Sequence, residues 1–171
     1  MEARITRDGA LISDQTASSE LAAKGYGEMT GKGLLLSREE SVLMSENRKE
    51  FSVRSQSGKK YAYAELLRHY SGSDNEFAKK YLAFRDLRTR GFCVKPGFRG
   101  ESHYRVYSRG DKPSSGNAIW LVKCVTEEAT FSFPQLEKEI QSASSVRKKV
   151  MYAISDKEGD MTYYIIDKAN P

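Results

Sequence analysis

The chain has 171 residues, 39% of them hydrophobic and 11% aromatic, and a formal net charge of +5. This composition excludes a disordered chain and suits one domain or two small ones. Because no apolar run approaches about 18 residues and MEARITRDGA has no apolar signal-peptide core, we expect a soluble, cytoplasmic protein without a membrane partner.

The first part of the chain alternates short strand and helix patterns. Ser37 followed by Glu40 is a capping-box pattern, which predicts a helix that begins at Ser37. The other elements predicted here are short strands with turns over 1–36, a short helix at 18–24, a strand at 51–55 and a helix at 61–70.

A long amphipathic helix is predicted next. Ser73 and Glu76 form a second capping-box pattern, and apolar residues then recur at spacings of four, four and three. We predict a helix over 74–90, with Gly91 as its C-cap. The elements predicted after it are strands at 92–97, 102–108 and 118–125, a helix at 132–144, and a hairpin of 149–155 with 161–167.

This order of elements predicts an α+β fold. The polar, turn-rich run SGSDNEF is the predicted boundary between an N-terminal domain, 1–72, and a C-terminal domain, 73–171. The two cysteines, Cys93 and Cys124, lie in apolar runs and are predicted to be buried thiols. No metal site and no cofactor are expected, because the sequence holds two histidines and no metal-ligand, dinucleotide or phosphate-loop motif.

Candidate chemistry centres on Tyr107, which precedes a loop that ends at Asn117. A tyrosine that acts as a base needs nearby cations to lower its pKa, whereas most tyrosines of this kind are core residues. The run SSVRKK supplies Arg147, Lys148 and Lys149, as phosphate contacts or as a solvated charge cluster. The residues alone indicate a basic α+β protein that is compatible with RNA binding.

His103 is a possible acid for Tyr107, but the spacing disfavours the pair. Both residues share one face of a predicted strand, where four residues span about 13 Å. An acid and a base must both reach atoms of one reacting phosphate. His103 is therefore interpreted as a surface or packing residue.

The second half of the chain resembles the archaeal tRNA-splicing endonuclease family. The matching strings are YLAFRDLRTRGFCVKPG, YRVYSRG, IWLVKCV and SSVRKKVMYAISDKEGDMTYY, and KGYGEMTGKGLLLSREESVLM resembles the family's N-terminal domain more loosely. The resemblance implies a C-terminal mixed β-sheet flanked by helices. It also implies metal-free cleavage of precursor tRNA by the ribose 2′-hydroxyl, giving a 2′,3′-cyclic phosphate and a 5′-hydroxyl.

Catalytic members of this family use a tyrosine as base, a histidine as acid and a lysine to stabilise the transition state. By resemblance, the tyrosine is Tyr107 and the lysine is Lys148, but the position of the histidine holds Asn117. An arginine that clamps an extruded base in catalytic members is replaced by Gln141. A third departure is GFRGESHYRVY, where the family has a Gly-rich FG-D-F run.

Some members are heterotetramers of catalytic and structural subunits, and the resemblance implies two contacts between subunits. One is an acidic turn that enters a basic cleft, and the other is pairing of the last strands. The matching residues are Asp156, Glu158 and Asp160 in the turn and Tyr163, Tyr164 and Ile165 in the strand. An ordinary exposed hairpin is the alternative for the turn.

The sequence supports three hypotheses for the function. The leading hypothesis is a structural subunit that pairs with a homologous catalytic subunit as an α2β2 heterotetramer on precursor tRNA, with Arg147 and Lys149 contacting RNA and the chain alone inactive. The second is a catalytic subunit in which another group, such as His103, supplies the acid. The third is an RNA-binding or assembly protein with the same fold.

Overall fold

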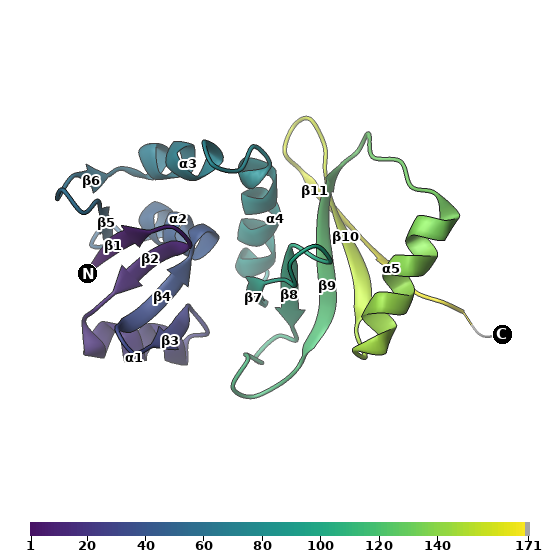
Figure 1. The fold of residues 1–171 in the computed structure, drawn as a ribbon, viewed down its shortest axis with the longest axis horizontal. Helices are drawn as coiled ribbons and strands as arrows, with labels where there is room; N and C mark the ends of the chain where they lie inside the picture. Colours follow the sequence, from purple (N-terminus) through teal and green to yellow (C-terminus); the bar gives the residue numbers. More distant parts are fainter. Residues whose placement is uncertain (170–171) are drawn as a thin grey trace. The chain divides into compact units, whose positions relative to one another are not determined.

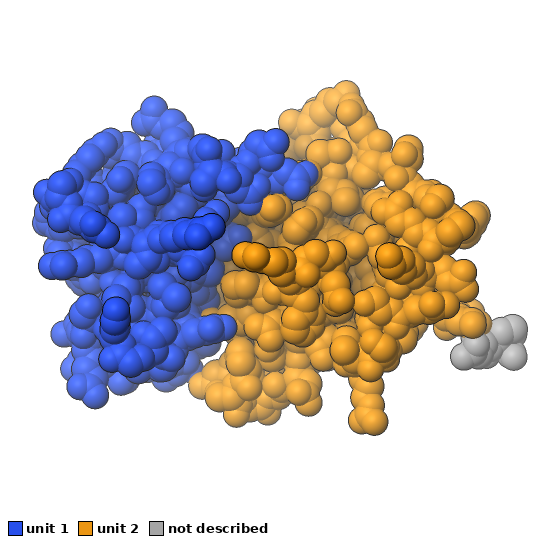
Figure 2. All heavy atoms as spheres, viewed as in Figure 1, with its two compact units in different colours: residues 1–78 blue, residues 79–171 orange. Residues whose placement is uncertain are grey.

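The structure is a computed structural model that describes residues 1–169. The chain divides into two compact units, residues 1–78 and residues 79 onward (Figure 2). The division follows Ala78, inside the first turn of the helix that was expected to open the C-terminal domain. Each unit is built on its own mixed β-sheet with helices, which confirms the α+β fold class.

Unit 1 contains a six-stranded sheet in the order β3-β4-β2-β1-β5-β6 (Figure 1). The β1–β5 pair is parallel and the other pairs are antiparallel. Its strands are β1 (Glu2–Thr6), β2 (Gly9–Ile12), β3 (Glu28–Thr30), β4 (Gly33–Ser37), β5 (Ser52–Arg54) and β6 (Lys60–Tyr61), and its helices are α1 (Gln15–Ala23), α2 (Arg38–Asn47) and α3 (Tyr63–Ser71).

Local capping fixes the helices of unit 1. The predicted capping box at the start of α2 is confirmed, since Ser37 and Glu40 exchange side-chain and backbone hydrogen bonds. Glu40 is buried, and its Oε2 also accepts from Gly27 N, so the same carboxylate anchors the preceding loop. Helix α1 begins earlier than predicted because Asp14 caps it, accepting from Ala17 N at 2.7 Å.

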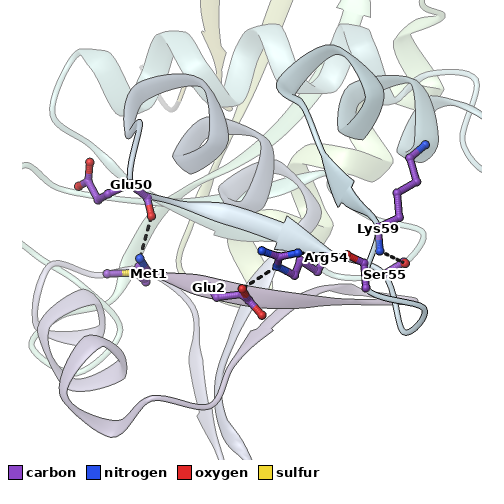
Figure 3. Close-up of polar contacts among 7 residues, drawn as sticks. Met1, Glu2, Glu50, Arg54, Ser55 and Lys59 are labelled. Atoms are coloured by element: carbon purple, nitrogen blue, oxygen red, sulfur yellow. Dashed lines mark hydrogen bonds and ion pairs between the residues drawn. The ribbon is translucent and has the colours of Figure 1, made fainter.

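The parallel β1–β5 pair is held by polar contacts at its side chains and at its start (Figure 3). The Met1 amino group donates to Glu50 O at 2.7 Å, and Arg54 Nε lies 2.6 Å from Glu2 Oε2. The Arg54–Glu2 pair is exposed, so it contributes little to stability and chiefly aligns the two strands.

Unit 2 contains a five-stranded sheet in the order β11-β10-β9-β8-β7, in which β9 and β10 are parallel and the other pairs are antiparallel. Its elements are α4 (Phe77–Thr89), β7 (Cys93–Pro96), β8 (Tyr104–Tyr107), β9 (Ala118–Thr126), α5 (Phe133–Ser145), β10 (Lys149–Ser155) and β11 (Met161–Ile166). The strands, α5 and the Gly91 C-cap of α4 all fall where the sequence predicts them.

Helices α4 and α5 cover opposite faces of this sheet (Figure 1). Phe84 of α4 contacts the Tyr104 ring, with ring centroids 5.7 Å apart. Leu121 packs instead with Ala143 of α5. Tyr104 pairs with Val122, the neighbour of Leu121, and successive strand residues point to opposite faces.

The predicted capping box of Ser73 and Glu76 is not formed. The Ser73 hydroxyl donates to Tyr70 O at 3.0 Å, at the end of α3, and α4 begins at Phe77 rather than at residue 74. The backbone between the helices turns instead around Asp74, whose Oδ1 accepts from Glu76 N. The Ser73 hydroxyl therefore bonds to the end of α3, whereas the sequence pattern predicts that it caps the start of α4.

Tyr163 on β11 gives unit 2 a predicted sensitivity to alkali. Its hydroxyl donates to Asp86 Oδ2 of α4 at 2.6 Å, and Arg90 pairs with the same oxygen at 2.7 Å. Burial, followed by the bond to Asp86, raises the Tyr163 pKa well above its usual value. A raised folded-state pKa contributes stability below the unfolded pKa of about 10, and this contribution is lost as pH rises above it.

Tyr163→Phe is therefore expected to lower stability at pH 7 by about 1 kcal/mol and to flatten the fall of Tm above about pH 10. The measurement is Tm against pH from neutrality to strong alkali. Tyr164→Phe is the matched control, because the neighbouring ring is exposed. Parallel curves for the wild-type chain and Tyr163→Phe would contradict the assignment.

Candidate functional site

Three residues singled out from the sequence lie along one border of the unit 2 sheet, where β8 ends and where β9 and β10 begin. Tyr107 ends β8 and pairs with Ala118, the first residue of β9, so Asn117 immediately precedes that strand. Lys149 begins β10 and pairs with Trp120 of β9, so Lys148 immediately precedes β10. We call this region the β8–β10 edge. It spans three neighbouring strands, or about 10 Å between the outer backbones.

The end of α5 places Lys148. Lys148 N donates to Ala143 O at 2.9 Å, and Arg147 N donates to Ser144 O at 2.9 Å. This is the Schellman arrangement, which requires a left-handed residue at Arg147. Arg147 has φ 58°, the only positive φ of a non-glycine residue within 1–169, whereas the matching position after α4 is Gly91 with φ 88°. The chain keeps a strained arginine beside Lys148 where glycine would fit.

We expect Arg147→Gly to raise the free energy of unfolding by about 1 kcal/mol, and Tm by about 3 °C, because it relieves the left-handed strain. Arg147→Ala is the control, since it removes the same guanidinium and keeps the Cβ. Thermal unfolding of both variants checks this. Equal Tm changes in the two variants would show that the backbone at Arg147 carries no strain.

The members of the edge differ in exposure. Tyr107 is buried and clusters with Cys93 and Ala118, whereas Asn117 is exposed. Lys148 is half-buried, and its Nζ donates to Val146 O at 3.1 Å. A cation beside a tyrosine and an amide can bind and orient a phosphate. The asparagine side chain has no proton to release near neutral pH.

His103 lies away from the β8–β10 edge. Its backbone N donates to Val122 O, and its Nδ1 accepts from Cys124 N at 2.8 Å. Both partners are several residues along β9 from Ala118, the partner of Tyr107. Nδ1 is therefore engaged as a hydrogen-bond acceptor and is not a proton donor in this arrangement.

The remaining predicted nucleic-acid contacts lie on the surface. Arg147 and Lys149 are exposed, and Lys149 pairs with Asp167 at 3.0 Å. Gln141 is exposed on α5, and its Nε2 contacts Glu137 Oε1 at 3.4 Å.

The predicted subunit contacts lie at the other end of β10 and on β11. In the turn, Asp156 Oδ1 accepts from Asp160 N at 2.8 Å, so Asp156 also holds the turn together. Glu158 and Asp160 are exposed. Strand β11 is an edge strand of the sheet, with Tyr164 and Ile165 exposed and Tyr163 half-buried. An edge strand with exposed apolar residues favours pairing with another chain.

Sequence reasoning missed a polar cluster beneath α5. Lys123 Nζ lies 2.7 Å from Glu139 Oε1, and the Tyr152 hydroxyl donates to Glu139 Oε2. Burial would raise the Glu139 pKa, but the bonds from Lys123 and Tyr152 outweigh it and hold the pKa below its usual value. The apolar side of α5 gave no signal of this cluster, because Lys123 and Tyr152 lie on neighbouring strands and meet Glu139 only in the fold.

Within residues 1–169 no group of three or more His, Cys, Asp or Glu side chains could hold a metal ion. Over the same residues, none of the helices has the length and apolar character needed to cross a bilayer.

The chain has two units and carries Tyr107, Asn117 and Lys148 at the β8–β10 edge of one mixed sheet. Residues 77–163 match the sequence profile of the tRNA intron endonuclease catalytic C-terminal domain. The chain therefore belongs to the tRNA-splicing endonuclease family, which confirms the family inferred from the sequence.

Curated relatives extend the match over both units. The chain is 32% identical over 168 residues to the tRNA-splicing endonuclease of Thermococcus onnurineus, covering 98% of this chain and 95% of that one. It is 34% identical over 165 residues to that of Thermococcus kodakarensis, covering 95% of each. It is 32% identical over 169 residues to that of Methanococcoides burtonii, but spans only 46% of that longer protein.

Proposed function

We propose that this chain is the structural subunit of a tRNA-splicing endonuclease. It pairs with a homologous catalytic subunit as an α2β2 heterotetramer and helps to hold precursor tRNA. The observation that carries the proposal is Asn117 at the β8–β10 edge. The leaving 5′-oxygen needs a proton near neutral pH, which a histidine can supply and an asparagine cannot.

Two further observations support a retained scaffold rather than a working catalyst. Gln141 stands where catalytic relatives are expected to hold an arginine, and it contacts its own helix neighbour Glu137. Tyr107 and Lys148 persist, but Tyr107 is buried in a small apolar cluster. By this proposal, the site lacks both the acid and the base clamp of catalytic relatives. The fold is retained, together with the acidic turn and strand β11 that are expected to contact another subunit.

The competing function is a catalytic subunit with His103 as the acid. The bond from Cys124 N to His103 Nδ1 counts against it, and so does the position of His103, which precedes β8 while Tyr107 ends that strand. If the chain cleaves RNA, His103→Ala distinguishes the two functions. Loss of a general acid lowers the cleavage rate by a factor of about 10²–10⁴.

The direct test incubates an intron-containing precursor tRNA with the full chain alone, and then with the homologous catalytic subunit. We expect negligible cutting by the chain alone and efficient cutting by the mixture, with 2′,3′-cyclic phosphate and 5′-hydroxyl products. Efficient cutting by the chain alone would overturn the structural-subunit assignment. Failure of the two chains to co-elute and to bind precursor tRNA would overturn the wider proposal.

A further inference from the structure

Three cations lie in a row across strands β1, β5 and β6 of the unit 1 sheet. Arg4 pairs with Arg54 in the parallel β1–β5 ladder, and Arg54 pairs with Lys60 in the antiparallel β5–β6 ladder. Residues that pair directly across strands have their side chains on the same face of a sheet. Because neighbouring strands are about 4.8 Å apart, the backbones of Arg4 and Lys60 lie about 10 Å apart. We call these three residues the cation row.

The cation row lies on the outward face of the sheet. Ala3 precedes Arg4 on β1 and is buried, and Val53 precedes Arg54 on β5 and is also buried. Successive strand residues point to opposite faces, so the row points away from the core of unit 1. Arg4 and Lys60 are exposed, and the Arg54 side chain is 40% exposed. The row therefore presents its charges to solvent.

Arg54, the middle member of the row, is held by two contacts. Its Nε lies 2.6 Å from Glu2 Oε2 (Figure 3). Its Nη1 donates to Gly58 O at 3.1 Å. No acidic side chain within residues 1–169 forms an ion pair with Arg4 or Lys60. The row therefore keeps an excess of positive charge around a fixed guanidinium.

This arrangement works against the stability of the sheet. Like charges directly opposite one another on neighbouring strands are destabilising. Both cross-strand pairs of the row, Arg4 with Arg54 and Arg54 with Lys60, are of this kind. A polyanion in contact with the row would remove the repulsion. The row is therefore better explained by a polyanionic partner than by the folding of unit 1.

The shape of the cation row favours RNA over an acidic protein segment. The row crosses the outward face of a sheet with one cation about every 4.8 Å. An RNA strand carries its phosphates in a continuous line, and arginine and lysine supply many of the contacts that proteins make with such phosphates. An acidic turn presents its carboxylates at a projecting tip, which a row on a sheet face contacts only in part.

We infer that the cation row of unit 1 binds the phosphate backbone of precursor tRNA, in addition to the contacts made by the β8–β10 edge of unit 2. The inference rests on the proposed function, in which the chain helps to hold precursor tRNA, and assigns part of that task to unit 1. Phosphate contacts fix the position of a nucleic acid and carry no sequence information. The row therefore anchors the RNA whatever its sequence.

The test measures affinity for intron-containing precursor tRNA, over a range of salt concentrations, of the full chain in complex with its catalytic homologue. Arg4→Gln combined with Lys60→Gln should weaken binding about tenfold. The slope of log K against log salt should become shallower by about 1.4–1.8, which is 0.7–0.9 for each lost phosphate contact. Arg54 is left unchanged, because its contacts with Glu2 and Gly58 hold neighbouring segments of the sheet.

Lys24→Gln combined with Lys32→Gln is the matched control. Both lysines are exposed in unit 1 outside the row, and their loss makes the same change in net charge. This control should bind normally. A second measurement follows modification of each lysine of the wild-type complex by an amine-reactive acylating reagent, detected by mass spectrometry. RNA should slow modification of Lys60 severalfold and leave that of Lys24 and Lys32 unchanged.

Normal affinity and an unchanged salt slope for the Arg4→Gln, Lys60→Gln variant, without protection of Lys60, would overturn the inference and leave the proposed function intact. Equal weakening by the control variant would show a net-charge effect and also overturn it. Loss of co-elution with the catalytic homologue in the absence of RNA would make the row a protein contact and overturn it as well. Absence of RNA binding by the wild-type complex would overturn the proposed function itself.

Discussion

Replacing Asn117 by histidine is expected to create a cleaving site at the β8–β10 edge. The variant supplies a proton donor immediately before β9, next to the Tyr107–Ala118 pair, and Lys148 immediately precedes the neighbouring strand β10. A positioned acid contributes about 10²–10⁴ in rate, so the gain should be easy to detect against an inactive background. Because the imidazolium is the acid, the rate should fall as pH rises above about 6.5.

The assay uses the complex with a catalytic homologue whose own histidine has been replaced by alanine, so that cutting reports this chain. Asn117→Ala is the control and should give no gain. Adding Gln141→Arg should increase the gain if that position clamps a base. Addition of Tyr107→Phe to Asn117→His should abolish it. A folded, RNA-binding Asn117→His variant that cuts no faster than Asn117→Ala would disprove the assignment of Asn117 to the acid position.

The second large effect is expected at the acidic turn. Charge reversal with Glu158→Lys and Asp160→Lys should raise the Kd for the catalytic homologue by roughly 100-fold or more, because like charges that face each other cost several kcal/mol. Asp156 is left unchanged, since its side chain accepts from Asp160 N and holds the turn. The double variant therefore tests the charge of the turn without removing that bond.

Size-exclusion chromatography and titration of the two subunits measure this effect. The control reverses two exposed glutamates of unit 1, Glu20→Lys and Glu28→Lys, which make the same change in net charge elsewhere. It should assemble normally. Unchanged assembly of the turn variant would show that the acidic turn is not part of the interface. Strand β11 would then be the candidate contact. Equal weakening by both variants would indicate a net-charge effect rather than a local contact.

Local chemistry explains why much of the fold could be predicted. The Ser37–Glu40 capping box, the glycine after α4 and the β-rich run of β10 all depend on residues a few positions apart. The failed capping box at Ser73 shows the limit of such patterns. Its hydroxyl had two backbone segments within reach, and it donates to the end of α3.

The sequence by itself determined the family and the order of elements, because these are properties of residue identity and short spacing. It also predicts that Asn117 stands in place of the family's histidine. Only the tertiary structure decided that Tyr107, Asn117 and Lys148 meet at one edge, since strand order and register join residues far apart in the chain. It also decided that Cys124 N donates to His103 Nδ1 and that the Arg105 guanidinium lies 5.3 Å from the centroid of the Phe98 ring. Such contacts form when the sheet closes and α5 packs on it, and no local pattern encodes them.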